Sequence, residues 1–277
     1  MSSKKRRNFF ADIQADGADV TETRRLIQNL MRQASGDDRK VYMMASASRG
    51  EGKSTLCALL ATVAARVFQK QTLIIDADMR RPTMHLLLDL PQQPGLYELL
   101  QGHVSLDVVL RPTPLLTLKG LTSGRVTGSQ ADAYRDTAFA DLIRRVRPSF
   151  DFIFVDAAPI VPVTEPLLMA EHVDGILVVA MAGKSGLPML HRMSQLLTPV
   201  LPKVVGAVVN NPENYLPYYY EHRYYGYRSP DLRRGAHQAG GTSSPATGAT
   251  PDTGRKERHD HDSKTIFESE RTRHHRA

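Results

Sequence analysis

Short apolar runs alternate with helical patterns through most of the chain. The runs lie at 40–46, 72–78, 150–159, 175–181 and 203–211. Each is bounded by polar or turn-forming residues, as buried strands are. Strands that are apolar throughout, rather than on alternate residues, are typical of a parallel sheet covered by helices on both faces. The pattern therefore predicts an α/β fold with a mostly parallel sheet.

The segments before and between these strands have helical spacing. Helices are expected at 21–33, 53–70, 165–173 and 187–201. In the first of them, apolar residues recur about one turn apart, and Thr21 is the candidate N-cap.

Composition changes on both sides of this region. The first residues are polar and basic, and from 229 the chain is rich in Gly, Ser, Thr, Pro and His. Such sequence cannot bury enough apolar surface to offset the entropy cost of folding. The expected organisation is a flexible basic N-terminus (1–20), a folded domain (21–211), a tyrosine-rich segment (212–228) and a disordered tail (229–277).

Charge and cysteine content narrow the function classes. The 277 residues carry a net charge of +7, which favours anionic partners such as phosphates. The basic residues of the tail are mixed with acids, so we expect no nucleic-acid binding. A single cysteine, Cys57, excludes an intrachain disulfide and fits a reducing cytoplasm. No run approaches the roughly 18 apolar residues of a membrane span, and the basic start lacks the apolar run of a signal peptide.

The loop between the first predicted strand and the helix that follows it carries the clearest chemistry. It reads SASRGEGKST (46–55), a variant Walker A motif in which Ala47 replaces the first glycine. Glycines let the backbone approach a phosphate, and the following helix directs free N–H groups at it. Lys53 would neutralise the β- and γ-phosphates, Ser54 would bind Mg²⁺, and Thr55 would help to hold the α-phosphate. The expected nucleotide contacts are Gly50, Glu51, Gly52, Lys53, Ser54 and Thr55.

Three aspartates follow predicted strands. Asp76 and Asp78 end the run LIIDAD, and Asp156 ends FIFVD. Carboxylates at the C-terminal ends of parallel strands lie in the crevice where ligands bind. Asp156 has the Walker B role of orienting Mg²⁺. We expect Asp76 and Asp78, two residues apart, to point to the same side of their strand.

These motifs together resemble the bacterial protein-tyrosine kinases (BY-kinases) of exopolysaccharide and capsule synthesis. That family carries a Walker A motif, a DxDxR motif, a Walker B aspartate and a C-terminal tyrosine cluster. Here the second of these is Asp76, Asp78 and Arg80, and the four elements keep their order over roughly 20–227. The resemblance implies a P-loop NTPase-like architecture of the MinD/ParA type, with ATP and Mg²⁺ as cofactors.

The resemblance also implies residue roles. Lys53, Asp76 and Asp78 are the expected catalytic residues, with Asp76 activating the tyrosine hydroxyl. Ser54, Asp76 and Asp156 are the expected metal-binding residues, and Asp78 could also lie at the metal. Which acid is the base stays open. Asn210 or Asn211, at the end of the last strand, would lie near the adenine.

The tyrosine cluster holds seven of the ten tyrosines in the chain. Pro217 and interleaved charges argue against a core element, although packing at an interface would also favour tyrosine. With the motifs above, the cluster resembles a substrate whose phosphorylation adds negative charge and disfavours close packing of the tails. The expected phosphoacceptors are Tyr215, Tyr218, Tyr219, Tyr220, Tyr224, Tyr225 and Tyr227.

Partners and alternatives follow from the same resemblance. It implies a membrane polysaccharide co-polymerase as a separate activator, a location at the inner face of the membrane through that partner, and a cognate phosphotyrosine phosphatase. It also implies a homo-oligomer formed through Glu22 and Arg25, with Gln28 where the family has a second arginine. Two rival functions are a MinD/ParA-type switch ATPase, whose signature lysine is replaced by Ser48, and a non-catalytic nucleotide-binding adaptor.

Overall fold

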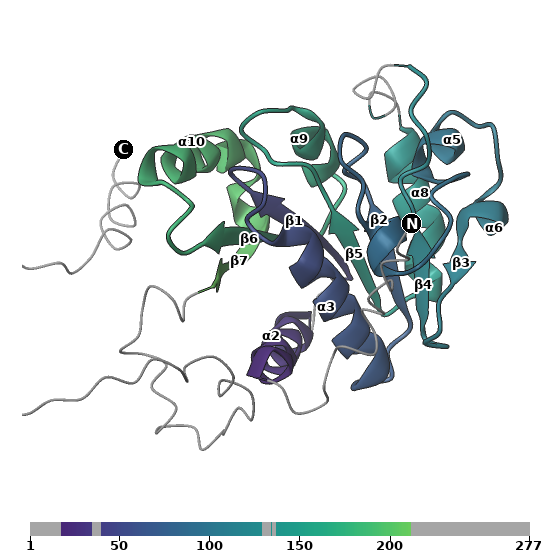
Figure 1. The fold of residues 1–277 in the computed structure, drawn as a ribbon, viewed down its shortest axis with the longest axis horizontal. Helices are drawn as coiled ribbons and strands as arrows, with labels where there is room; N and C mark the ends of the chain where they lie inside the picture. The colour runs from purple at the N-terminus through teal and green to yellow at the C-terminus, as the bar shows by residue number, and fades with distance from the viewer. Residues whose placement is uncertain (1–17, 35–39, 129–133, 135–136, 212–277) are drawn as a thin grey trace, which may run out of the picture. The chain divides into compact units, whose positions relative to one another are not determined.

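The computed structural model describes residues 18–34, 40–128, 134 and 137–211. Within them, seven strands form one sheet in the order β3-β4-β2-β5-β1-β6-β7 (Figure 1). All neighbouring pairs are parallel except β3 with β4. The strands are β1 (Val41–Ser46), β2 (Thr72–Asp76), β3 (Arg111–Pro112), β4 (Leu118–Leu121), β5 (Phe152–Asp156), β6 (Gly175–Met181) and β7 (Val204–Asn210). The mostly parallel sheet predicted from the apolar runs is confirmed.

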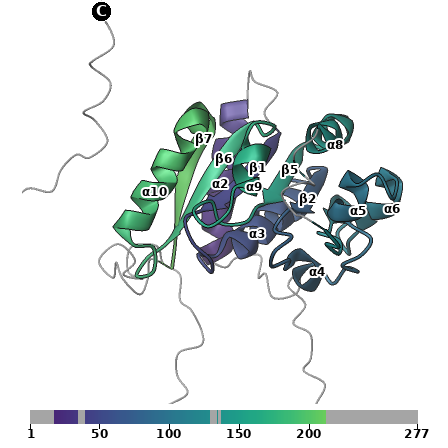
Figure 2. The same ribbon diagram turned by 90° about the horizontal axis from the view of Figure 1, so that it is seen from above.

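Helices cover both faces of this sheet, as Figures 1 and 2 show. The α-helices are α2 (Ala18–Ala34), α3 (Lys53–Arg66), α4 (Met84–Leu87), α5 (Leu96–Leu100), α6 (Leu106–Val109), α8 (Ala138–Val146), α9 (Glu165–Ala170) and α10 (Leu187–Leu197). Two 3-10 turns, η1 (Arg147–Ser149) and η2 (Thr198–Lys203), precede β5 and β7. None of the helices in the described ranges is long and apolar enough to cross a membrane.

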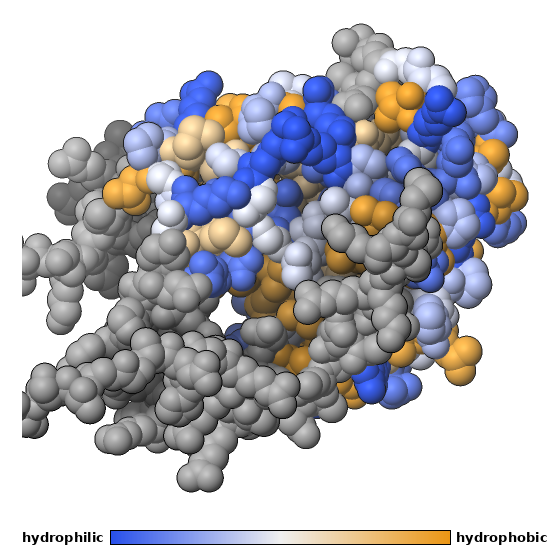
Figure 3. All heavy atoms as spheres, viewed as in Figure 1, coloured by the Kyte–Doolittle hydropathy of each residue, from blue (hydrophilic) through white to orange (hydrophobic). Residues whose placement is uncertain are grey.

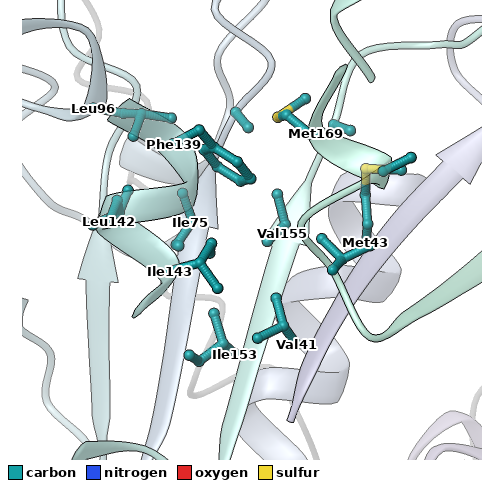
Figure 4. Packing of buried hydrophobic residues seen from close by; sticks show 14 of the residues in the cluster. Val41, Met43, Ile75, Leu96, Phe139, Leu142, Ile143, Ile153, Val155 and Met169 are labelled. Atoms are coloured by element: carbon teal, nitrogen blue, oxygen red, sulfur yellow. The ribbon is translucent and has the colours of Figure 1, made fainter. Parts of the chain in front are cut away.

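Two hydrophobic cores result, one on each face of the sheet. Helices α2, α3 and α4 pack on one face, where Ile27 and Leu60 are fully buried. Helices α5, α6, α8, α9 and α10 pack on the other, and Figure 4 shows Phe139 of α8 and Met169 of α9 above Val155 of β5. Every residue of β1, β2 and β5 is buried, which explains why their sequences are apolar runs without alternation. The face drawn in Figure 3 has hydrophobic residues interspersed with hydrophilic ones.

Several boundaries differ from the sequence predictions. Helix α2 begins at Ala18, so Thr21 lies inside the helix and the predicted N-cap is wrong. Strand β2 ends at Asp76, so Asp78 lies beyond the strand, and the prediction that both acids share one strand side is wrong. Strand β4 and helix α8 had no sequence prediction, since β4 has only four residues and is interrupted by the exposed Lys119.

Strand order brings the C-terminal ends of β2, β5, β1, β6 and β7 to one edge of the sheet. Strand β5 lies between β1 and β2, although it follows both along the chain. Open α/β sheets bind ligands at such a switch point, where the chain turns from one side of the first strand to the other. The edge formed by these five strand ends is therefore where a site is expected.

At the opposite end of the sheet, Asp174 ties three segments together. Its carboxylate accepts hydrogen bonds from the amides of Lys40 and Val41, both at 2.8 Å, and from Arg147 Nη2 at 2.6 Å. Burial alone would raise the pKa of Asp174, but these hydrogen bonds outweigh it and leave the pKa below its ordinary value. The ionised carboxylate thus fixes the start of β1 against the turn that precedes β6.

We expect Asp174→Asn to lower the free energy of unfolding by about 1–3 kcal/mol at pH 7, the usual loss for hydrogen bonds to a charged group. Because the folded-state pKa is depressed, this contribution is present above the unfolded-state pKa and disappears as the pH falls through the folded-state value. Urea unfolding of both proteins from pH 7 to pH 3 measures it. Curves that stay equally far apart at all pH values would contradict the assignment.

Candidate active site

The phosphate-binding loop connects β1 to α3 through two glycines in a left-handed conformation. Gly50 has φ +71° and Gly52 has φ +91°, values that side chains rarely adopt. A Cβ atom at Gly50 would collide with Lys184 Nζ, and one at Gly52 would collide with Asn210 Nδ2. The backbone conformation therefore favours glycine at both positions, and a side chain there would displace that of Lys184 or Asn210.

Helix α3 begins at Lys53, directly after Gly52, and Leu56 N donates to Gly52 O at 2.9 Å. The first N–H groups of a helix have no partner within the helix, and its dipole is positive at this end. Lys53 is only 6% exposed, so its ammonium is held at the loop rather than in solvent. The arrangement fits the predicted binding of an anionic polyphosphate.

Two buried carboxylates lie beside this loop. Asp76 and Asp156 occupy the same register position on the neighbouring strands β2 and β5, and both are fully buried. Asp76 Oδ2 accepts from the amides of Thr83 (3.1 Å) and Met84 (2.9 Å). Among the described residues, Asp76 Oδ1 and both oxygens of Asp156 are buried without a hydrogen-bond partner.

Burial raises the pKa of both acids. It raises the pKa of Asp156 to about 6, against the opposing effects of the nearby Lys53 ammonium and Ser54 hydroxyl. For Asp76, burial and the Asp156 charge raise the pKa well above its usual range, although two backbone amides oppose this. Adjacent buried carboxylates are ionised at low cost only when a cation lies between or beside them.

Mg²⁺ fits this donor set. The described residues contain no group of three or more His, Cys, Asp or Glu side chains that could hold a metal by themselves. Mg²⁺ does not need such a group, unlike zinc, because it usually binds through one or two carboxylates together with substrate phosphates and water. Asp76, Asp156 and Ser54 could hold such an ion next to a nucleotide bound at the loop.

Asp78 lies just past β2 and is 9% exposed. Its Oδ1 accepts from Arg81 N at 3.1 Å in a local turn. Arg80, the arginine of the DxDxR motif, is held by Glu165 at the start of α9, with Nη2 and Nε at 2.6 and 3.1 Å from Oε1. The structure thus brings Asp78 and Arg80 to the edge that carries the acid pair.

Two contacts in this region had no sequence prediction. Glu165 is 4% exposed and pairs with an arginine 85 positions away. Tyr134 is buried, and its hydroxyl donates to the carbonyl of Ala77, the residue between the two motif aspartates, at 3.1 Å. No local sequence signal identifies either, because both depend on chain segments that meet only in the folded protein.

On the other side of the loop, Asn210 ends β7 and its Nδ2 donates to Glu51 O at 3.3 Å. Asn210 therefore contacts the phosphate loop, a contact that the sequence did not predict, and its predicted place near the adenine stays a prediction. The Glu51 side chain is 1% exposed and accepts a hydrogen bond from Ser48 N at 2.9 Å, so its carboxylate contacts the protein and not solvent. The seven predicted phosphoacceptor tyrosines, 215–227, lie outside the described residues.

Comparison with known proteins places this arrangement in a family. No protein-family model matches the chain. It is 32% identical over 195 residues to CapB of Staphylococcus aureus, covering 69% of this chain and 85% of CapB. It is 30% identical over 195 residues to the tyrosine-protein kinase CpsD of Streptococcus pneumoniae, covering 70% of this chain and 86% of CpsD. A 30% identical match of 202 residues covers 69% of this chain and 26% of the succinoglycan biosynthesis transport protein ExoP of Rhizobium meliloti.

Solved structures share the fold. The kinase domain of the Escherichia coli tyrosine kinase ETK superposes with a TM-score of 0.69 at 24% identity, covering 76% of this chain and 82% of that domain. MinD of Pyrococcus horikoshii, solved with Mg-ADP, superposes with a TM-score of 0.51 at 18% identity, covering 62% of this chain and 69% of MinD. The fold is thus common to kinases and MinD ATPases, while sequence identity over most of CpsD and CapB separates the two groups. The chain belongs to the bacterial protein-tyrosine kinases, the BY-kinases.

Proposed function

We propose that this protein is an ATP-dependent autokinase that phosphorylates its own C-terminal tyrosine cluster, between subunits, and thereby regulates exopolysaccharide or capsular polysaccharide synthesis and export. The observation that carries the proposal is the buried pair Asp76 and Asp156 beside Lys53 at the phosphate loop. This set supplies one fixed cation and two carboxylates, which could bind a metal or accept a proton. Phosphoryl transfer depends mainly on positioning and charge neutralisation, which these groups provide.

The phosphate loop and Lys53 would hold the nucleotide. The first amides of α3 and the Lys53 ammonium are directed at the β- and γ-phosphates, and the ammonium offsets the charge that develops on the leaving ADP. Ser54, Asp76 and Asp156 would hold Mg²⁺, which would supply positive charge next to the phosphates. With that cation bound, ionisation of the acid pair would cost less, because Asp76 Oδ1 and both oxygens of Asp156 have no hydrogen-bond partner among the described residues.

The acids of the DxDxR motif would activate the acceptor. As the tyrosine oxygen forms a bond to the γ-phosphorus, its proton passes to a carboxylate and the bond from that phosphorus to ADP breaks. Asp76 is the proposed base, because it is the motif acid that lies on the strand next to Asp156, beside the phosphate loop. Asp78, two residues after Asp76 in the same motif, is the other acid that could take this role.

The acceptor is proposed to be the tyrosine cluster at 215–227. The last residue that the structure describes before this segment is Asn211, one position after Asn210, whose side chain contacts the phosphate loop. The cluster therefore follows directly after the site in the sequence. Transfer between subunits would use a homo-oligomer, and Glu22 and Arg25 on the outer face of α2 form an exposed ion pair at 2.7 Å that could contribute to it.

A membrane partner is part of the proposal. This chain matches about a quarter of the length of ExoP, whose name describes a succinoglycan biosynthesis transport protein. We propose that a membrane polysaccharide co-polymerase activates this kinase at the inner face of the membrane, and that a phosphotyrosine phosphatase reverses the modification. A MinD-type switch ATPase is the main alternative, favoured by the shared fold and opposed by Ser48 at the position of the signature lysine.

Incubation with Mg·ATP, with and without the cytoplasmic segment of the membrane partner, is expected to place phosphate on tyrosines between 215 and 227. Lys53→Met should lower this by more than about 100-fold, because the charge at the leaving phosphates is lost. Mass spectrometry of phosphopeptides measures both. ATP hydrolysis without phosphotyrosine would instead establish the switch ATPase, and nucleotide binding without either activity would establish the adaptor.

Glu165→Gln is expected to lower kcat by about ten- to a hundredfold with little change in the KM for ATP, because Arg80 and the DxDxR turn lose their anchor. Asp141→Asn is the matched control. It also removes a carboxylate from an arginine, Arg144 at 2.9 Å, but on the exposed face of α8. Equal kinetic effects of the two substitutions would contradict a positioning role for Glu165.

A further inference from the structure

A short segment after β6, residues 182–186, reaches across to the phosphate loop. Lys184 Nζ donates to the carbonyl oxygen of Gly50 at 2.9 Å, and the Ser185 hydroxyl donates to Glu51 Oε1. These contacts join residues 134 positions apart. Nothing in the motifs of the sequence identifies either residue.

The segment is itself held in place on the end of β6. Ser185 Oγ accepts from Met181 N at 2.8 Å, and the amides of Lys184 and Ser185 both donate to Met181 O, at 3.1 and 2.9 Å. Gly183, with φ +74°, allows the tight turn between them. Lys184 therefore extends from an ordered base, and its ammonium occupies the space that a Cβ atom of Gly50 would need.

The geometry of the peptide bond relates this contact to the direction of the neighbouring backbone N–H groups. A trans peptide unit is planar, so its N–H points in the opposite direction to its C=O. The carbonyl of Gly50 points to Lys184, so the N–H of Glu51, in the same unit, points away from the β6 segment. The carbonyl of Glu51 points to Asn210 of β7, so the N–H of Gly52 is turned away from β7 in the same manner.

We propose that Lys184 is a positioning residue for the nucleotide, acting with Ser185 through the phosphate loop. By holding the Gly50 carbonyl from outside, Lys184 keeps the Glu51 N–H directed into the loop, where phosphate oxygens bind. Ser185 supports the same turn through the buried Glu51 carboxylate, whose other oxygen accepts from Ser48 N. This inference deepens the proposed function, since it rests on the loop being the nucleotide site.

A preorganised loop loses less conformational entropy on binding, so loss of the Lys184 contact should weaken nucleotide affinity more than catalysis. We expect Lys184→Met to raise the Kd for Mg·ADP about tenfold, the effect of losing one charge-assisted hydrogen bond. The KM for ATP should rise in parallel while kcat changes by less than about twofold. Lys184→Arg keeps the donor and the charge and should recover most of the affinity.

Lys203→Met is the matched control. Lys203 Nζ also donates to backbone carbonyls, those of Ala170 and Glu171 at 3.1 and 2.6 Å, but far from the phosphate loop along the sheet. Its removal should leave the Kd for Mg·ADP unchanged. If Lys203→Met weakened binding as much as Lys184→Met, the effect would be one of general stability and the proposal would be wrong.

Hydrogen exchange of nucleotide-free protein completes the test. Peptides covering 46–55 should exchange faster in Lys184→Met than in the wild type and in Lys203→Met, because the loop amides are no longer oriented by the carbonyl contact. This measurement does not depend on kinase activity, so it decides the proposal even if the wild type makes no phosphotyrosine. Unchanged exchange together with an unchanged Kd, or an arginine variant as weak as the methionine variant, would overturn it.

Discussion

The site depends on the position of β5 between β1 and β2. This position sets Asp156 opposite Asp76 on one side and next to Met44 of β1 on the other, so the acid pair lies directly beside the loop that follows β1. Because β2, β5, β1, β6 and β7 are all parallel, their C-terminal ends meet at one edge whatever their order in the sequence. The chemistry of the protein is therefore a consequence of strand order. A sheet with the same strands but β2 next to β1 would take Asp156 away from the loop that follows β1.

The acid pair is suited to binding a ligand and does not stabilise the folded protein by itself. Two fully buried carboxylates on adjacent strands raise each other's cost of ionisation, and Lys53 offsets only part of it. Hydrophobic residues at both positions would continue the cores on either face. Binding of a cation removes the conflict, and a polyphosphate brings that cation with it. Under the proposed function, the unfavourable electrostatics of the nucleotide-free protein would contribute to the affinity for Mg·ATP.

Sequence reasoning reached the parts of the site that are encoded locally. The glycines and Lys53 form a contiguous motif, and Asp76 and Asp156 were identified because they end apolar runs. Asp78 was assigned to the strand because DAD continues the run, whereas the backbone turns after Asp76, whose carboxylate binds the amides of Thr83 and Met84. Glu165, Tyr134 and Lys184 were not found. Each contacts the site through a backbone atom or a guanidinium far away in the sequence, and no periodicity or spacing encodes such contacts.

The same strand order divides the site into two halves. Asp76 and Asp156 lie on the β2–β5 side of the phosphate loop, and Lys184 and Asn210 lie on the β6–β7 side. The first half carries the groups that could bind a metal and move a proton, while the second orients the loop through its carbonyl oxygens. These tasks need no shared side chain, so one half can change its chemistry while the other keeps the loop in a binding conformation. The kinase domain of ETK and MinD share this sheet architecture, and one architecture can carry different chemistry when the groups that react are separate from those that shape the loop.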